Sequence, residues 1–134
     1  MGKLSRDKGA RGEREALHLL KRELGNIAEN VQRNYLEQSA HGGCDLVGLP
    51  PFAIEIKRAK NYSSKWSLQA AEQAARVSES AIPVVMYRID RHDWRVEIPG
   101  RFLINELKDE NEIITMSAPA FCTIVRERLS VGGS

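Results

Sequence analysis

The sequence predicts an α/β protein in which a central mixed β-sheet is flanked by helices. Residues 10–24 and 66–80 carry apolar side chains at helical spacing, whereas residues 44–57 form two short apolar runs around a turn. Residues 82–89 are densely apolar, and residues 94–98 alternate between apolar and polar. This order of helix, strands, helix and strands is typical of a sheet covered by helices.

The composition indicates one globular domain over residues 1–134, long enough to bury a core. No apolar run approaches membrane-spanning length, so no membrane partner is expected. Cys44 and Cys122 lie far apart and form no CxxC pattern, which argues against a zinc site or a disulfide. Both are expected to be reduced thiols in a cytoplasmic protein.

The first helix is expected over residues 10–24, where Gly25-Asn26 ends it, and residues 1–8 are expected to be flexible. Its buried stripe consists of Ala16, Leu17, Leu20 and Leu24. Glu13 precedes this stripe by one turn, so its carboxylate can reach inward toward a site on the sheet. An alternative role for Glu13 is that of a helix acid favoured by the macrodipole. A first strand is expected over residues 30–38.

The hairpin at residues 44–57 carries the most informative side chains. A Gly-Leu-Pro-Pro sequence predicts a turn between strands at residues 44–47 and 52–57. Since side chains alternate along a strand, one face of the second strand is apolar and the other carries Glu55 and Lys57. The apolar face holds Phe52, Ile54 and Ile56.

Asp45, Glu55 and Lys57 together fit a magnesium site that acts on phosphate. Mg²⁺ is commonly held by one or two carboxylates, here Asp45 and Glu55, together with substrate phosphate oxygens. Lys57 is suited to position a water molecule or to stabilise charge on the phosphate. The alternative is a surface hairpin with a local ion pair.

A second helix is expected from Trp66 or Ser67 to about residue 80, with Ser67 as its N-cap. Its small face, which can pack closely on a sheet, consists of Ala70, Ala71, Ala74 and Ala75. Another face carries Gln69, Gln73 and Arg76, which either contact a phosphate backbone, support the site or face solvent.

The C-terminal half is expected to begin with a central strand at residues 82–89, which forms a hairpin with residues 94–98. A short helix at 102–107 and a strand at 113–116 follow. Residues 121–129 are expected to form a strand or a helix, since Pro119 leaves the choice open, and residues 130–134 are expected to be flexible.

The positive charges are unevenly distributed, although the net charge is only +2. They gather in the first segment and after the Glu55–Lys57 strand, at Lys3, Arg6, Lys8, Arg11, Arg14, Arg58, Lys60 and Lys65. A basic region beside a candidate metal site suits a polyanionic substrate such as DNA. A solvated charged surface is the alternative.

Asp45, followed ten residues later by Glu55-Ile56-Lys57, resembles the PD-(D/E)xK nuclease signature. Residues 8–15 (KGARGERE) are similar to the N-terminal helix of archaeal-type Holliday junction resolvases, which places a catalytic glutamate at the position of Glu13. The strands around residues 83–88 and 94–98 fall where that family has strands, so the resemblance covers about residues 8–98.

The resemblance implies a restriction-endonuclease-like fold and Mg²⁺-dependent hydrolysis of DNA phosphodiester bonds, with Mn²⁺ as a substitute. Asp45 and Glu55 would then ligate the metal together with the Ile56 carbonyl, and Glu13 would contribute through the metal or its water shell. Lys57 would orient the attacking water.

The resemblance also implies a DNA-binding surface and a homodimer, because a four-way junction needs two symmetric cuts. Arg14 matches a basic residue beside the helix glutamate, and Gln73 is favoured over Gln69 as the supporting polar residue. With the basic charge pattern, the expected DNA-binding residues are Lys8, Arg11, Arg14, Arg58, Lys60 and Gln73. Roles in DNA recombination and repair follow, with residues 100–129 as a family-specific C-terminal extension.

Two departures from the resolvase pattern are visible. Cys44 stands where a proline is usual, and Ser39 does not match the spacing of the serine that resolvases carry before the aspartate. Three hypotheses therefore remain: a junction endonuclease, a nuclease of the same fold for flaps, single strands or other repair intermediates, and an inactive DNA-binding module. The set Glu13, Asp45, Glu55 and Lys57 argues against the third, because an inactive protein has no chemical need for all four.

Overall fold

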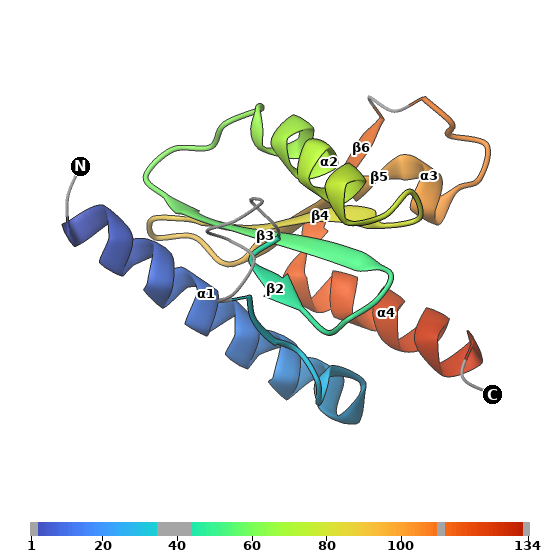
Figure 1. Ribbon diagram of the computed structural model, residues 1–134, viewed down its shortest axis with the longest axis horizontal. Helices are drawn as coiled ribbons and strands as arrows, with labels where there is room; N and C mark the ends of the chain where they lie inside the picture. Colours follow the sequence, from blue (N-terminus) through green and yellow to red (C-terminus); the bar gives the residue numbers. More distant parts are fainter. Residues whose placement is uncertain (1–2, 35–43, 110–111, 133–134) are drawn as a thin grey trace.

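The computed structural model describes residues 3–34, 44–109 and 112–132, with side chains for residues 8–34, 44–109 and 112–129. A six-stranded mixed sheet in the order β1-β2-β3-β4-β5-β6 forms its centre (Figure 1). The apolar side chains of α1 (Lys3–Leu24) and α4 (Ala118–Gly132) pack on one face, while α2 (Trp66–Val77) packs on the other. The predicted class, a mixed sheet flanked by helices, is therefore confirmed.

Helix α1 begins at Lys3 rather than at residue 10, so part of the N-terminal segment expected to be flexible continues the helix. It ends at Leu24, where Gly25 has a φ of +56° that few other residues adopt, and a short 3₁₀ helix, η1 (Gly25–Ala28), follows. Three members of the predicted stripe, Ala16, Leu20 and Leu24, are buried, whereas Leu17 is half-buried.

Strands β1 (Gln32–Arg33), β2 (Leu46–Val47) and β3 (Phe52–Ala59) form an antiparallel series at one edge of the sheet. The strand predicted at residues 30–38 is thus shorter within the described part of the chain, and residues 35–38 lie outside it. The predicted turn joins β2 to β3, and its Gly48 has a φ of +98°. The two predicted faces of β3 are confirmed, since Phe52, Ile54 and Ile56 all enter the main core.

Helix α2 connects β3 to the parallel strand β4 (Ile82–Ile89), which lies in the middle of the sheet as predicted. The N-cap prediction is wrong, because Ser67 lies inside α2 and Lys65 precedes the helix without a capping side chain. The small face is also narrower than predicted. Only Ala70 and Ala74 are buried, because one side of a straight helix meets a sheet.

The C-terminal third completes the sheet and the core. Strand β5 (Arg95–Pro99) pairs antiparallel with β4, and β6 (Ile113–Ser117) pairs antiparallel with β5. The short helix lies at Gly100–Leu103 (α3) rather than at 102–107. Residues 121–129 belong to α4, which accepts Pro119 in its first turn, where no intrahelical N–H donor is needed. The helix also continues to Gly132, beyond the expected start of the flexible tail.

Candidate active site

The three charged residues of the predicted hairpin meet where β2 leads into β3. The Asp45 amide donates to the Ile54 carbonyl at 2.9 Å, which fixes Asp45 beside β3. The Asp45 Oδ2 atom in turn accepts a hydrogen bond from the Ile56 amide at 2.7 Å. This carboxylate is therefore held against the strand backbone next to Glu55.

Glu55 has a strongly raised pKa, caused by its burial and its acidic neighbours. Burial, then the negative charge of Asp45 and a hydrogen bond shared with it, raise the pKa of Glu55 to about 8. Because two carboxylates share a hydrogen bond only when one carries a proton, the metal-free pair holds a proton near neutral pH. The Glu55 Oε1 atom is buried and has no hydrogen-bond donor among the described residues.

Lys57 is the next residue on the same face of β3, and its positive charge opposes the rise in the pKa of Glu55. Its half-buried side chain makes no hydrogen bond or ion pair to any residue that the structure describes. An ammonium group in this position is available to a water molecule or to a phosphate oxygen.

Glu13 reaches the site from α1, as its position beside the apolar stripe predicted. Its Oε1 atom accepts a hydrogen bond from Arg33 Nε at 2.8 Å, and both side chains are more than four-fifths buried. Its charge also contributes to the raised pKa of Glu55, so the two carboxylates are electrostatically coupled. Glu13 is thus directed inward, and Arg33 holds it in place.

Gln73 on α2 faces the site side of the sheet. Its Oε1 atom is buried and has no hydrogen-bond donor among the described residues, whereas Gln69 is exposed. A buried amide oxygen without a donor is costly, and one function of such a group is to receive a water molecule or a ligand. This observation favours Gln73 over Gln69 as the supporting residue.

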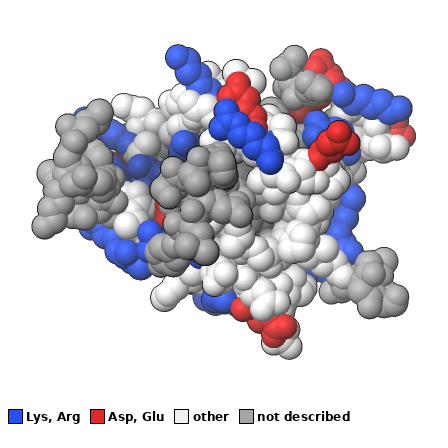
Figure 2. Space-filling model, in the orientation of Figure 1, with Lys and Arg blue, Asp and Glu red and all other residues white. Residues whose placement is uncertain are grey.

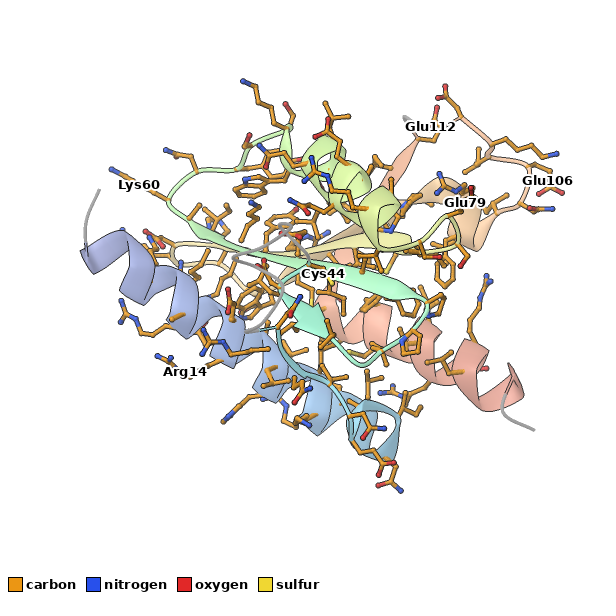
Figure 3. The ribbon with its side chains drawn as sticks, in the orientation of Figure 1. Arg14, Cys44, Lys60, Glu79, Glu106 and Glu112 are labelled. Carbon is orange, nitrogen blue, oxygen red and sulfur yellow. The ribbon has the colours of Figure 1, made fainter. Side chains whose placement is uncertain are left out.

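The predicted DNA-binding cations fall into two groups. Lys8 and Arg58 are paired with Asp90, with a Lys8 Nζ–Asp90 Oδ1 distance of 3.0 Å, so much of their charge is engaged. Arg11, Arg14 and Lys60 are exposed on α1 and at the end of β3, and the side chain of Arg14 points away from the sheet (Figure 3). Basic side chains are seen on that end of the molecule, and others lie along the top and at the opposite end of the view (Figure 2).

Three contributors were not predicted. Arg33 was not singled out because an arginine in an edge strand has no distinctive spacing. Asn34 is buried and donates from Nδ2 to the Cys44 carbonyl at 3.0 Å. This hydrogen bond joins the residue after β1 to the residue before Asp45. Tyr62 donates its hydroxyl proton to Glu97, and only the folded sheet brings these two residues together. Ser39 lies outside the described residues.

Both cysteines are free and buried, as expected for reduced thiols. Burial raises the pKa of the Cys44 thiol, which donates to the Leu46 carbonyl at 3.2 Å. The thiol at the usual proline position is therefore a buried hydrogen-bond donor in the hairpin. In the parts of the chain described, no helix is both long and apolar enough to cross a membrane.

The donor set fits a hard divalent cation. Asp45 and Glu55 supply carboxylate oxygens, one of them buried without a donor, at a pair that otherwise shares a proton. Among the described side chains, no group of three or more His, Cys, Asp or Glu is arranged to hold a metal. Glu13 therefore suits the water shell of an ion better than direct ligation, and a metal here would keep several waters, as Mg²⁺ does.

A cavity lies apart from these groups. It measures about 400 Å³ and lies between α2 and the β4–β6 side of the sheet, where Ala71, Ala75, Val85 and Ile98 are among its lining residues. Neither Asp45 nor Glu55 lines it. This cavity is therefore separate from the candidate active site.

Comparison with known proteins gives a family match over most of the chain. The model of the family described as "Phage putative PDDEXK endonuclease" matches residues 4–126. Among solved structures, the fold is similar to that of Hjc, a Holliday junction resolvase from the hyperthermophilic archaeon Archaeoglobus fulgidus. That similarity has a TM-score of 0.47 and 21% sequence identity, and it covers 83% of this chain and 84% of that chain. No curated protein sequence matches.

Proposed function

Because the chain belongs to the PDDEXK endonuclease family, we propose that it is a metal-dependent endonuclease that hydrolyses DNA phosphodiester bonds, with four-way junctions as its preferred substrate. The observation that carries the metal dependence is the pair of Asp45 and Glu55. Two carboxylates that share a proton near neutral pH gain from exchanging that proton for a divalent cation.

Each side chain of the candidate site has a proposed role in catalysis. Asp45, Glu55 and the Ile56 carbonyl would hold Mg²⁺, or Mn²⁺ in its place. The bound ion would supply a polarised phosphate oxygen and a water of lowered pKa. Lys57, on the same strand face, positions the attacking water and neutralises charge that develops on the phosphate. Glu13, fixed by Arg33, orients water molecules on the α1 side of the site.

DNA binding is proposed for the end of the molecule that carries the N-terminal part of α1 and the end of β3. Arg11, Arg14 and Lys60 are exposed on these elements and would contact phosphates along one strand. Lys8 and Arg58, paired with Asp90, contribute less net charge and mainly join α1 to the β4–β5 turn. A homodimer would supply the two sites that a junction requires.

The experiment is cleavage of an end-labelled four-way junction beside duplex, flap and single-stranded controls, in Mg²⁺ and in EDTA. Paired symmetric cuts near the branch point are expected from the wild type in Mg²⁺ alone. Lys57→Ala should lower the rate by about 10²- to 10³-fold, the usual cost of removing one group that stabilises developing charge. Lys108→Ala, at an exposed lysine distant from the site, is the matched control.

Other outcomes discriminate among the alternatives. Cutting of flaps or single strands without junction preference would retain the catalytic roles and reject the resolvase proposal. Tight junction binding without cleavage in any divalent metal would reject the enzyme proposal. Calorimetry with Mg²⁺ adds an independent measurement, because Asp45→Ala should abolish metal binding without unfolding the protein.

A further inference from the structure

Tyr62 is an exposed aromatic residue whose hydroxyl is held by a buried acid. Here the hydroxyl donates to Glu97, which is only 4% exposed, while the residue as a whole is 49% exposed. The hydroxyl is thus anchored by a buried acid, while about half of the residue's surface remains in solvent.

Glu97, which holds the Tyr62 hydroxyl, is a buried acid with few hydrogen-bond partners in the part of the chain that the structure describes. Glu97 is a buried carboxylate whose Oε2 accepts from Tyr62 and whose Oε1 has no donor among the described residues. Burying a carboxylate with so little compensation costs stability. This hydrogen bond also raises the pKa of Tyr62 to about 12, so the hydroxyl stays protonated as a donor throughout the neutral range.

Two further rings limit the movement of Tyr62. Its ring centroid lies 5.3 Å from that of Trp66 in an edge-to-face arrangement and 5.5 Å from that of Tyr87. Trp66 and Tyr87 are buried and contact one another. Tyr62 is therefore held at its hydroxyl and along its ring, and little conformational entropy remains to be lost when a ligand contacts it.

The position of this ring relates it to the candidate active site. Tyr87 is the register partner of Lys57 on the neighbouring strand, and Glu97 lies in the same sheet row as Glu55, with Val85 between them. All these side chains project from the α2 face of the sheet. Tyr62 follows β3 in the loop that leads to α2, and the exposed Lys60 and Lys65 flank it. In Figure 3, Lys60 marks the start of this loop.

We propose that Tyr62 is a stacking platform for an unpaired nucleobase of the DNA substrate, adjacent to the site of cleavage. An exposed, preorganised aromatic ring between lysines is the combination by which proteins hold single-stranded nucleic acid. Bases inside a duplex are already stacked on their neighbours, so the platform selects DNA with an unpaired base near the cut. This inference rests on the proposed nuclease function and adds a requirement that the substrate be locally unpaired.

The test measures binding without catalysis. Full-length protein is titrated in EDTA with a single strand that contains 2-aminopurine and with a blunt duplex of the same length. Wild type should bind the single strand and quench its fluorescence by stacking. Tyr62→Leu should weaken single-strand binding by roughly 5- to 150-fold, the range of one base–aromatic stack, and should change duplex binding by less than about twofold.

Two variants separate the contribution of the ring from those of the hydroxyl and of exposed apolar surface in general. Tyr62→Phe keeps the ring and removes only the hydrogen bond to Glu97, so it should retain most of the quenching. Leu68→Ala removes an apolar side chain of comparable exposure, 63%, on α2 and should bind like the wild type. Thermal melting of each variant confirms that it is folded before its affinity is compared.

Three results would overturn the inference: equal losses for single strand and duplex in Tyr62→Leu, no loss at all, or a Tyr62→Phe variant as weak as Tyr62→Leu. Cleavage by the wild type in Mg²⁺ is scored separately. A wild type that cleaves DNA while Tyr62→Leu binds normally would reject only the platform. A wild type that quenches 2-aminopurine but cleaves nothing would reject the nuclease proposal and leave Tyr62 only as a residue that binds an unpaired base.

Discussion

At the scale of single residues, the central group is the Glu55 carboxyl, which holds a proton without metal and is proposed to ligate a metal when it loses that proton. Glu55 is the residue whose burial and acidic neighbour make its charge most costly. In the absence of metal, a proton relieves that cost. The raised pKa supports the proposal that this site receives a cation, because an ion pair alone would have lowered the pKa of Glu55.

The affinity for Mg²⁺ should consequently depend on pH. Since Glu55 must lose its proton to ligate a metal and its pKa is about 8, affinity should rise by about tenfold per pH unit from pH 6 to 7.5 and level off above 8. Isothermal calorimetry in buffers of different ionisation enthalpy would measure both the affinity and the proton release. An affinity that does not change over this range would contradict the role of Glu55.

The same proton has a stability consequence of defined sign. The pKa of Glu55 rises from 4.5 to about 8 on folding, so the metal-free fold gains stability that is fully present below about pH 4.5 and is lost as the pH rises through 8. Glu55→Gln imitates the protonated form. Its melting temperature should exceed that of the wild type at pH 9 by more than at pH 5.5.

At the scale of elements, two glycines place the secondary structures that carry the site. Gly12 is buried on α1, and a Cβ there would lie 2.9 Å from the Arg58 Cβ on β3. Its lack of a side chain lets the helix approach the strand, next to Glu13. Gly48, in the turn between β2 and β3, has a φ of +98° and lies against the Asn30 carbonyl.

Gly48→Ala should therefore be strongly destabilising. The substitution combines an unfavourable φ with a collision between the new Cβ and the Asn30 backbone, and we expect a loss of more than about 2 kcal/mol in unfolding free energy. Urea unfolding followed by circular dichroism measures it. Gly9→Ala is the matched control, because its Cβ would meet no atom within 4 Å and the helix should gain about 0.5–1 kcal/mol. Equal effects at both positions would refute this role of the turn.

At the scale of the whole molecule, α1 and α4 pack on one face of the sheet, and α2 shares the other face with the candidate active site. Helices α1 and α4 bury the apolar side of β3, whereas α2 covers only part of the other side and leaves Glu55 and Lys57 half-exposed. Helix α4 is essential to this division. Phe121, Cys122 and Val125 are fully buried, and the Phe121 ring centroid lies 5.5 Å from that of Phe52 on β3.

Removal of the Phe121 side chain should then affect the whole fold. Phe121→Ala is expected to cost about 3–5 kcal/mol of unfolding free energy, as other large core truncations do. Thr123→Ala, on the exposed side of α4, should change stability by less than about 0.5 kcal/mol. A Phe121→Ala protein that melts like the wild type would show that the segment after β5 is separable from the core, as an added extension would be.

Sequence patterns predicted the elements whose evidence is local. The period of the side chains defined β3 and β4, and the turn sequence placed β2 antiparallel to β3, because a short turn permits no other pairing. The family match over residues 4–126 confirms the nuclease superfamily that the Asp45–Glu55–Lys57 spacing indicated. The start of α1 and the secondary structure of residues 121–129 were not predicted correctly or uniquely. A polar first turn gives no apolar period, and Pro119 is compatible with either a strand or the start of a helix.

What the sequence by itself determined is the chemistry of the candidate site: two acids and a lysine on adjoining strands, with a glutamate on the first helix. What only the tertiary structure decided is how these charges are supported. Arg33 contacts Glu13, and Glu97 anchors Tyr62 from 35 residues away along the chain. The physical reason is that alternation and helical period specify which side of an element a residue faces. Partners and burial instead depend on which elements the sheet brings together.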